Sequence, residues 1–111
     1  MSLQETMTMA TTAFSSGDFE SALAHFTKCT TLTENKSHLC TINTIKGAAL
    51  QRLNRFAEAV EAFNLALDAR PNYLQALFNN GVTLKALSRL EEALVMFDRA
   101  LEQEKKYYPV A

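Results

Sequence analysis

Apolar residues recur along the chain every three or four positions, which is the period of an amphipathic helix. Two long stripes and one shorter stripe show this period: Phe56, Val60, Phe63 and Leu67; Leu90, Leu94, Phe97 and Leu101; and Phe19, Leu23 and Phe26. No stretch alternates apolar and polar residues as a half-buried strand would. The pattern therefore predicts an all-α chain with six helices, at residues 3–15, 18–32, 37–53, 56–69, 72–87 and 90–105.

The chain also repeats itself at a fixed interval, which is the distance from Gly47 to Gly81. The phrase RFAEAVEAF at residues 55–63 returns as RLEEALVMF at residues 89–97. Other pairs at this interval are Ala59 and Ala93, Phe63 and Phe97, and Ala66 and Ala100. The first two helices fit the same frame if the loop at residues 33–39 holds three extra residues, which aligns Ala22, Phe26 and Cys29. The six predicted helices therefore form three similar pairs.

The small residues in these matched positions predict close contacts between helices. Glycine inside a helix costs roughly 0.5–1 kcal/mol relative to alanine, so Gly47 and Gly81 need a compensating interaction. Close approach of two helix backbones is the usual one, and it also accounts for the alanines at positions 22, 59 and 93. The space between one helix pair and the next is expected to be filled by Phe26, Phe63 and Phe97.

A helix–turn–helix unit with a period of about 34 residues resembles the tetratricopeptide repeat family. The motif residues are Leu77, Gly81, Ala93, Phe97 and Ala100 in the third unit, Gly47, Ala59, Phe63, Ala66 and Pro71 in the second, and Ala10, Ala22, Phe26 and Cys29 in the first. The resemblance implies a right-handed superhelical solenoid of three antiparallel repeats in a single domain, residues 1–111. The repeats would span about 3–36, 40–73 and 74–107, and a further repeat could begin at 108–111.

The sequence departs from the family pattern at five positions. The family prefers a large apolar residue four positions before the mid-helix glycine, where this chain has Asn43 and Thr6. It prefers leucine immediately before that glycine, where this chain has Lys46 and Asn80. Lys105 stands where proline would close the third unit. These residues bear on how the helices are packed and not on the fold class.

The resemblance also implies a function, that of a non-catalytic scaffold for protein–protein interactions. In this family the first helix of each unit lines a concave groove, which holds an extended peptide or a partner helix. Carried over residue by residue, the groove is lined by Met7, Thr11, Phe14, Thr41, Thr44, Ile45, Ala48, Gln51, Arg52, Gln75, Phe78, Asn79, Val82, Lys85 and Ala86. Ile45 and Phe78 are candidate apolar anchors, because binding energy concentrates in a few buried contacts. Contact with a neighbouring helix is the alternative for both.

Charged residues are unevenly distributed over the predicted helices. No Asp or Glu occurs between Glu34 and Glu58, or between Asp68 and Glu91. These windows hold the third and fifth predicted helices, with the cations Lys36, Lys46, Arg52 and Lys85. We therefore expect a mildly basic groove that favours an acidic protein or peptide, since complementary charge steers association. A solvated face with few charges is the alternative.

One subtype of the family binds the C-terminal carboxylate of heat-shock chaperones through two lysines, two asparagines and one arginine. The matching positions in this chain hold Met7, Thr11, Ile45, Gln75 and Asn79. Lysine and arginine are missing from this set. The comparison therefore predicts that the chain is not a carboxylate clamp for chaperone tails.

Composition argues against several other functions. A net charge of −1 argues against nucleic-acid binding driven by overall charge. No apolar run reaches the roughly 18 residues of a membrane span, and no secretion signal precedes the first helix, so we expect a cytoplasmic protein that binds no membrane. Cys29 and Cys40 are expected to be free thiols, and with His25 and His38 they lack the spacing of a metal site. We expect no enzyme activity and no cofactor.

The end of the chain indicates an alternative function. Residues 105–111, KKYYPVA, resemble the junction RPNYLQAL at residues 70–77, with Tyr107 in the place of Tyr73. The last helix would leave Phe97, Leu101 and Tyr108 uncovered, whereas a solenoid needs a polar cap. Either the array continues or the edge pairs with another copy. The alternative is therefore a structural module that forms a homo-oligomer through its C-terminal edge.

Overall fold

The computed structural model describes residues 1–107, in which it contains six α-helices and no strand. The helices are α1 (Leu3–Ser15), α2 (Phe19–Cys29), α3 (Lys36–Arg52), α4 (Phe56–Ala69), α5 (Leu74–Ala86) and α6 (Leu90–Tyr107). The prediction of an all-α chain with six helices is confirmed, and the largest error in a boundary is three residues, at the end of α2. The expected further repeat at 108–111, and with it Tyr108, lies outside the described residues.

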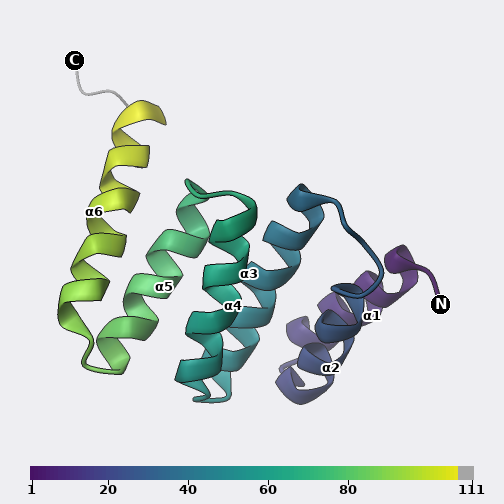
Figure 1. The fold of residues 1–111 in the computed structure, drawn as a ribbon. Coiled ribbons are helices and arrows are strands. Elements are labelled where there is room, and N and C mark those ends of the chain that lie inside the picture. The colour runs from purple at the N-terminus through teal and green to yellow at the C-terminus, as the bar shows by residue number, and fades with distance from the viewer. Residues whose placement is uncertain (108–111) are drawn as a thin grey trace.

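The helices form three antiparallel hairpins that stack side by side in chain order (Figure 1). Contacts join α1 to α2, α3 to α4 and α5 to α6 within hairpins, and α2 to α3 and α4 to α5 between hairpins. The main contacts of each hairpin are therefore with its neighbours, which is the arrangement of a solenoid. The amino terminus and the end of α6 lie at opposite ends of the stack (Figure 1).

Two helix ends differ from the prediction for local reasons. α2 ends at Cys29, and the hydroxyl groups of Thr30 and Thr31 donate back to the carbonyl oxygens of Thr27 and Lys28 at 2.6 and 2.7 Å. Such bonds offer the backbone an alternative to continuing the helix. α6 extends to Tyr107, since no proline interrupts it where the preceding repeat has Pro71.

The turn inside each hairpin has the same left-handed geometry. Its central residue is Gly17, Asn54 or Ser88, with φ values of 85°, 59° and 60°. In each turn the following backbone N–H, from Asp18, Arg55 or Arg89, donates to the carbonyl oxygen five residues earlier at 2.9 Å. Glycine adopts this conformation freely, whereas asparagine and especially serine do so at a cost. The hairpin geometry is therefore maintained by backbone hydrogen bonds, and the residue type varies.

The mid-helix glycines make room for phenylalanine rings in their own hairpins. A Cβ atom at Gly47 would lie 2.5 Å from Cε1 of Phe63, and one at Gly81 would lie 2.8 Å from Cε1 of Phe97. The expected close approach is therefore present, but it joins a backbone to a ring. Each ring packs against the glycine of its own first helix, and it also lies in a core cluster with a residue of the preceding hairpin, Leu23 for Phe63 and Val60 for Phe97.

The polar residues that depart from the family pattern are accommodated inside the stack. Thr6 is fully buried and its hydroxyl donates to the Ser2 carbonyl oxygen at 2.9 Å. Asn80 is fully buried and its Nδ2 donates to Asn64 Oδ1 on α4 at 3.0 Å. Among the described residues, Asn43 Oδ1 and Asn80 Oδ1 are buried without a hydrogen-bond partner. Of these residues, Asn80 joins two helices through a polar contact, whereas the hydrogen bond of Thr6 is local to α1.

We expect Gly47→Ala to lower the free energy of unfolding by about 1–3 kcal/mol, because the added methyl overpacks the buried Phe63 ring. The loss should appear although alanine is the better helix former. Gly81→Ala is the matched control and should cost less, since Phe97 is half-buried and can rotate away. Urea unfolding followed by circular dichroism measures both, and equal stabilities for wild type and Gly47→Ala would contradict the proposed contact.

We expect Ser88→Gly to raise the free energy of unfolding by about 0.5–1 kcal/mol, because glycine adopts the left-handed conformation without the strain that serine has there. The gain is reduced in part because glycine also increases the conformational entropy of the unfolded chain. Ser16→Gly is the control, since Ser16 has a φ of −84° that suits any residue. Thermal unfolding of the two variants compares them. A gain at Ser16 as large as that at Ser88 would show that backbone strain is not the cause.

Candidate functional site

A pocket lies where the first helices of the three hairpins meet, and we call it the central pocket. Its volume is about 230 Å³, and its walls are Thr11, Phe14, Ser15, Thr44, Ile45, Ala48 and Gln75. Residues from α1, α3 and α5 contribute to it. The structure therefore brings together six of the predicted groove residues, namely Thr11, Phe14, Thr44, Ile45, Ala48 and Gln75.

A second pocket of about 340 Å³ adjoins the first, between α1 and α3. It is lined by Leu3, Gln4, Met7, Thr8, Thr11, His38, Thr41 and Ile42. Thr11 belongs to both pockets, so the two form neighbouring parts of one surface. Met7 and Thr41 of the predicted groove lie here.

Hydrogen bonds fix α3 against α5 beside the central pocket. Gln51 Nε2 donates to the Asn79 carbonyl oxygen at 3.1 Å and also to Thr83 Oγ1. Thr83 Oγ1 in turn donates to the same Asn79 oxygen at 2.8 Å. The amide of Gln51 therefore fixes the distance between α3 and α5, and with it the width of the surface between these two helices.

Aromatic contacts form the end of the surface nearest the hairpin turns. The Arg52 guanidinium lies 5.6 Å from the centre of the Phe19 ring, which makes an edge-to-face contact with Phe14 at 5.2 Å. Such a stack positions a cation without neutralising it. Val82 and Lys85, both predicted groove residues, are exposed on α5.

Two predicted groove residues occupy equivalent positions but differ in exposure. Thr44 is 2% exposed and its hydroxyl donates to the Cys40 carbonyl oxygen, so it offers little surface to a ligand. Phe78 holds the same position one repeat later, on α5. It makes an edge-to-face contact with Phe97 at 5.8 Å and lies at the C-terminal end of the stack.

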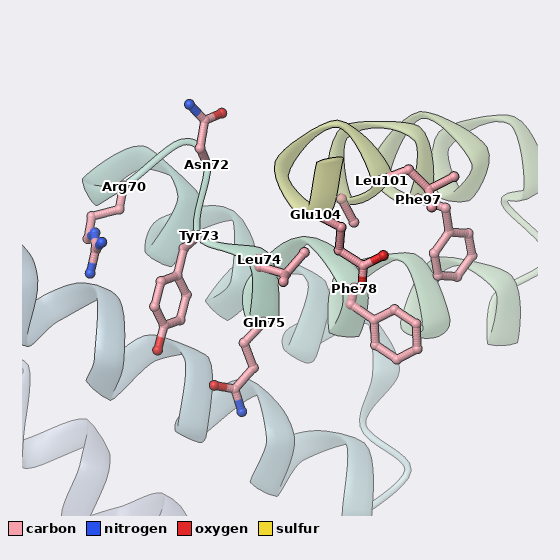
Figure 2. Close-up of a pocket in the computed structure, with 10 residues that line it drawn as sticks. Arg70, Asn72, Tyr73, Leu74, Gln75, Phe78, Phe97, Leu101 and Glu104 are labelled. Atoms are coloured by element: carbon pink, nitrogen blue, oxygen red, sulfur yellow. The ribbon is translucent and has the colours of Figure 1, made fainter. Parts of the chain in front are cut away.

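A larger pocket, of about 780 Å³, occupies this C-terminal end, and we call it the C-terminal pocket. Figure 2 shows its side chains on the loop before α5, on α5 itself and on α6: Arg70, Asn72, Tyr73, Leu74, Gln75, Phe78, Phe97, Ala100, Leu101 and Glu104. Phe97 and Leu101 were expected at this edge from the sequence, but the loop residues and Leu74 were missed. The repeat interval could have predicted Leu74. One repeat earlier, Cys40 and Leu67 form a core cluster with α5, and the residues equivalent to them are Leu74 and Leu101.

The expected basic groove stays a prediction, and Lys46 does not contribute to it. α3 and α5 contain no Asp or Glu, and besides Lys46 they carry Lys36, Arg52 and Lys85. Lys46, however, lines a pocket on the opposite side with Leu23, Glu58 and others, so it does not add to the charge of the predicted groove. Hydrogen bonding to Arg55, assisted by the charges of Arg55 and Lys46, lowers the pKa of the Glu58 carboxyl.

The described residues show no arrangement for redox or metal chemistry. Cys29 and Cys40 are free and buried, and burial raises the pKa of both thiols, which keeps them in the unreactive protonated form. Over residues 1–107, no group of three or more His, Cys, Asp and Glu side chains could hold a metal ion. No helix in this part of the chain is long and apolar enough to cross a membrane.

A comparison with protein families and curated proteins gives two matches. A family model described as tetratricopeptide repeat matches residues 7–36 and 41–73. An uncharacterised protein of Methanocaldococcus jannaschii is 38% identical over 60 residues, which cover 54% of this chain and 70% of that protein.

Several solved structures have the same fold. The TPR2B domain of yeast Sti1, in a pHsp70 complex, has a TM-score of 0.86 at 21% identity and covers 94% of this chain and 81% of its own. The first TPR domain of Spaghetti (RPAP3), bound to the HSP90 peptide SRMEEVD, has a TM-score of 0.85 at 27% identity, with 92% and 79% covered. A crystal structure of MamA has a TM-score of 0.89 at 17% identity, with 98% and 62% covered.

Proposed function

The chain belongs to the tetratricopeptide repeat family, and we propose that it is a non-catalytic scaffold that binds an extended peptide or a partner helix on the face formed by α1, α3 and α5. The observation that carries the proposal is the central pocket, which combines side chains from all three hairpins. The likeness to the Spaghetti domain, which is bound to a peptide, supports a peptide as the class of ligand.

The composition of the central pocket suits a peptide ligand. Phe14, Ile45 and Ala48 supply apolar wall, and the side chain of Ile45 is half-buried, so a ligand residue placed on it would lose most of its water. Binding energy concentrates in such desolvated contacts. Gln75 adds an exposed amide that can donate to and accept from a peptide backbone.

We propose that the ligand is acidic. Arg52 and Lys85 are exposed on α3 and α5, and neither helix carries an acidic residue that would oppose an anionic ligand. A field of one sign speeds association with a ligand of the other sign and selects against cationic ones. The basic character rests on these two residues, since Lys46 lies on the other side of the stack.

We also propose that the ligand's C-terminal carboxylate is not the feature recognised. The positions where the clamp subtype carries cations and asparagines hold Met7, Thr11, Ile45, Gln75 and Asn79. The Thr11 hydroxyl is engaged with the Met7 carbonyl oxygen at 2.9 Å, and Met7 itself is half-buried in a core cluster. No side chain in this set bears the positive charge that a clamp requires.

Ala48→Arg should weaken binding of the best ligand from an array of short peptides of graded net charge by about tenfold or more, because the long side chain fills the central pocket. Ala57→Arg, which adds the same side chain to an exposed position of α4, is the control. Fluorescence anisotropy measures both. If the two variants bind the peptide equally well, the central pocket is not the binding site.

Lys85→Glu should reduce the affinity for acidic peptides by about threefold to tenfold, and the loss should shrink as salt is added. Lys28→Glu is the matched control, because Lys28 is also exposed in the last turn of its helix, so both changes perturb the helix end similarly. Titrations at low and high salt test the effect. If Lys85→Glu binds acidic peptides as tightly as wild type does, the proposal of an acidic ligand is wrong.

The peptide SRMEEVD should bind no more tightly than the same peptide with an amidated C-terminus, because no pair of cations is placed to hold its carboxylate. Its three acidic side chains remain in both forms, so any attraction to Arg52 and Lys85 is common to the two. Isothermal titration of the pair is the measurement. A tenfold or greater loss on amidation, about 1.4 kcal/mol, would show that the chain uses a carboxylate clamp after all.

A further inference from the structure

Within residues 1–107, no helix covers the C-terminal end of the stack, although its surface resembles that of a helix–helix interface. One repeat earlier, α5 and its hairpin cover Thr44, Val60 and Leu67, which are 2%, 5% and 8% exposed. The equivalent residues of the last repeat are Phe78, Leu94 and Leu101, and they are 54%, 60% and 53% exposed. We define the C-terminal edge as these three residues with Leu90, Phe97 and Asp98. Its apolar side chains match those that a following helix buries in the preceding repeat.

The polar contact of the earlier interface indicates the chemistry of the missing helix. On α4, Asn64 Oδ1 accepts a hydrogen bond from Asn80 Nδ2 of the covering helix α5 at 3.0 Å. The residue equivalent to Asn64 on α6 is Asp98, which is exposed. A carboxylate accepts only, and its strongest partners are lysine and arginine. A helix that covered α6 as α5 covers α4 would therefore gain from a cation where α5 has Asn80.

Other acidic residues beside this stripe reinforce the preference. Glu104 lines the C-terminal pocket next to Leu101, and Glu91 is exposed next to Leu90 at the start of α6. The cations of α6 are Arg99, Lys105 and Lys106. Arg99 is held at the loop before α5, since its Nη2 donates to the Pro71 carbonyl oxygen at 2.6 Å, and Lys105 and Lys106 lie in the last turn, beyond Leu101. An apolar stripe with acidic flanks complements an amphipathic helix with basic flanks.

The two ways of covering the edge with a second copy are both unfavourable. In a head-to-tail stack, α1 of one copy would cover α6 of the other. Glu5 of α1 holds the repeat position of Ile42 in α3 and Ala76 in α5, which are both buried, so Glu5 would be buried too. Burying that carboxylate is costly, and it already accepts a hydrogen bond from Ser2 in the helix cap. In a two-fold dimer the same patch meets itself, which brings Asp98 and Glu104 of one copy near the acids of the other.

We propose that the C-terminal edge binds an amphipathic helix of a partner protein, which lies along α6 as α5 lies along α4 and presents a lysine or arginine to Asp98. This site lies at the end of the stack and borders the central pocket, because Gln75 lines both pockets, but it prefers the opposite charge. The bound helix would bury Leu94 and Leu101 and extend into the C-terminal pocket shown in Figure 2.

The test uses three synthetic peptides that copy residues 72–87 of this chain, because α5 is a helix known to cover the equivalent edge. The peptides have asparagine at position 80, or carry Asn80→Lys or Asn80→Glu. We expect the lysine peptide to bind about threefold to fivefold more tightly than the asparagine peptide, and the glutamate peptide to bind least. With Asp98→Lys in the protein, the order should reverse.

A pair of protein variants locates the binding site. Leu101→Ala should lower the affinity of the protein for the lysine peptide by about tenfold, since it removes apolar surface that the bound peptide would bury. Leu65→Ala should leave it unchanged, although Leu65 is equally exposed at 53%, because it lies on α4 away from the edge. Ala48→Arg should also leave it unchanged, which separates this site from the central pocket. Circular dichroism confirms that each variant is folded.

Three results would overturn the proposal. The first is that none of the peptides binds at millimolar concentration. The second is that the lysine peptide keeps its advantage when Asp98 is replaced by lysine. The third is that sedimentation shows a dimer of the wild-type chain that Leu101→Ala dissociates, since the edge would then serve a second copy.

Discussion

The contact between a helix glycine and a phenylalanine ring sets the geometry on which the rest of the structure depends. At Gly47 and Gly81 the ring of the second helix lies where a side chain would begin, so the two helices of a hairpin approach more closely than larger residues would permit. The same contact recurs in the next repeat, and turns of the same left-handed geometry close each hairpin. Similar hairpins stack in the same way, which aligns α1, α3 and α5 along one face and leaves an uncovered edge at the end.

Much of this fold could be predicted from the sequence, because helices and turns depend on the types of residues that lie close together in the chain. The stripes ending at Leu67 and Leu101 define helices, and the matched Gly47 and Gly81 define the repeat. Exposure of a given helix position was harder to predict. Thr44 and Phe78 hold the same position, yet one is buried and the other exposed, because a hairpin covers only the first. Lys46 was assigned to the wrong side because its position faces the preceding hairpin, as the contact between Asn80 and Asn64 shows for the next repeat.

The charges are divided unevenly between the helices. α3 and α5 have no acidic residue and carry Arg52 and Lys85, whereas α6 carries Glu91, Asp98 and Glu104. The separation follows from the repeat itself, since odd and even helices occupy different faces and their sequences can change independently. If both proposed sites bind, their charges would favour different ligands, although the overall charge of the chain is close to zero.

Stacking by neighbours alone has a consequence for the cooperativity of the domain. Within residues 1–107, the middle hairpin has a neighbour on each side and each outer hairpin has one, so in this part of the chain local opening should cost least at the two ends. The central pocket includes Thr11 from the first hairpin and Gln75 from the third. A ligand in that pocket spans the whole stack, and any outer hairpin that detaches must first release it. A ligand bound there would couple the opening of one end to that of the other, so that the bound domain would open as a unit.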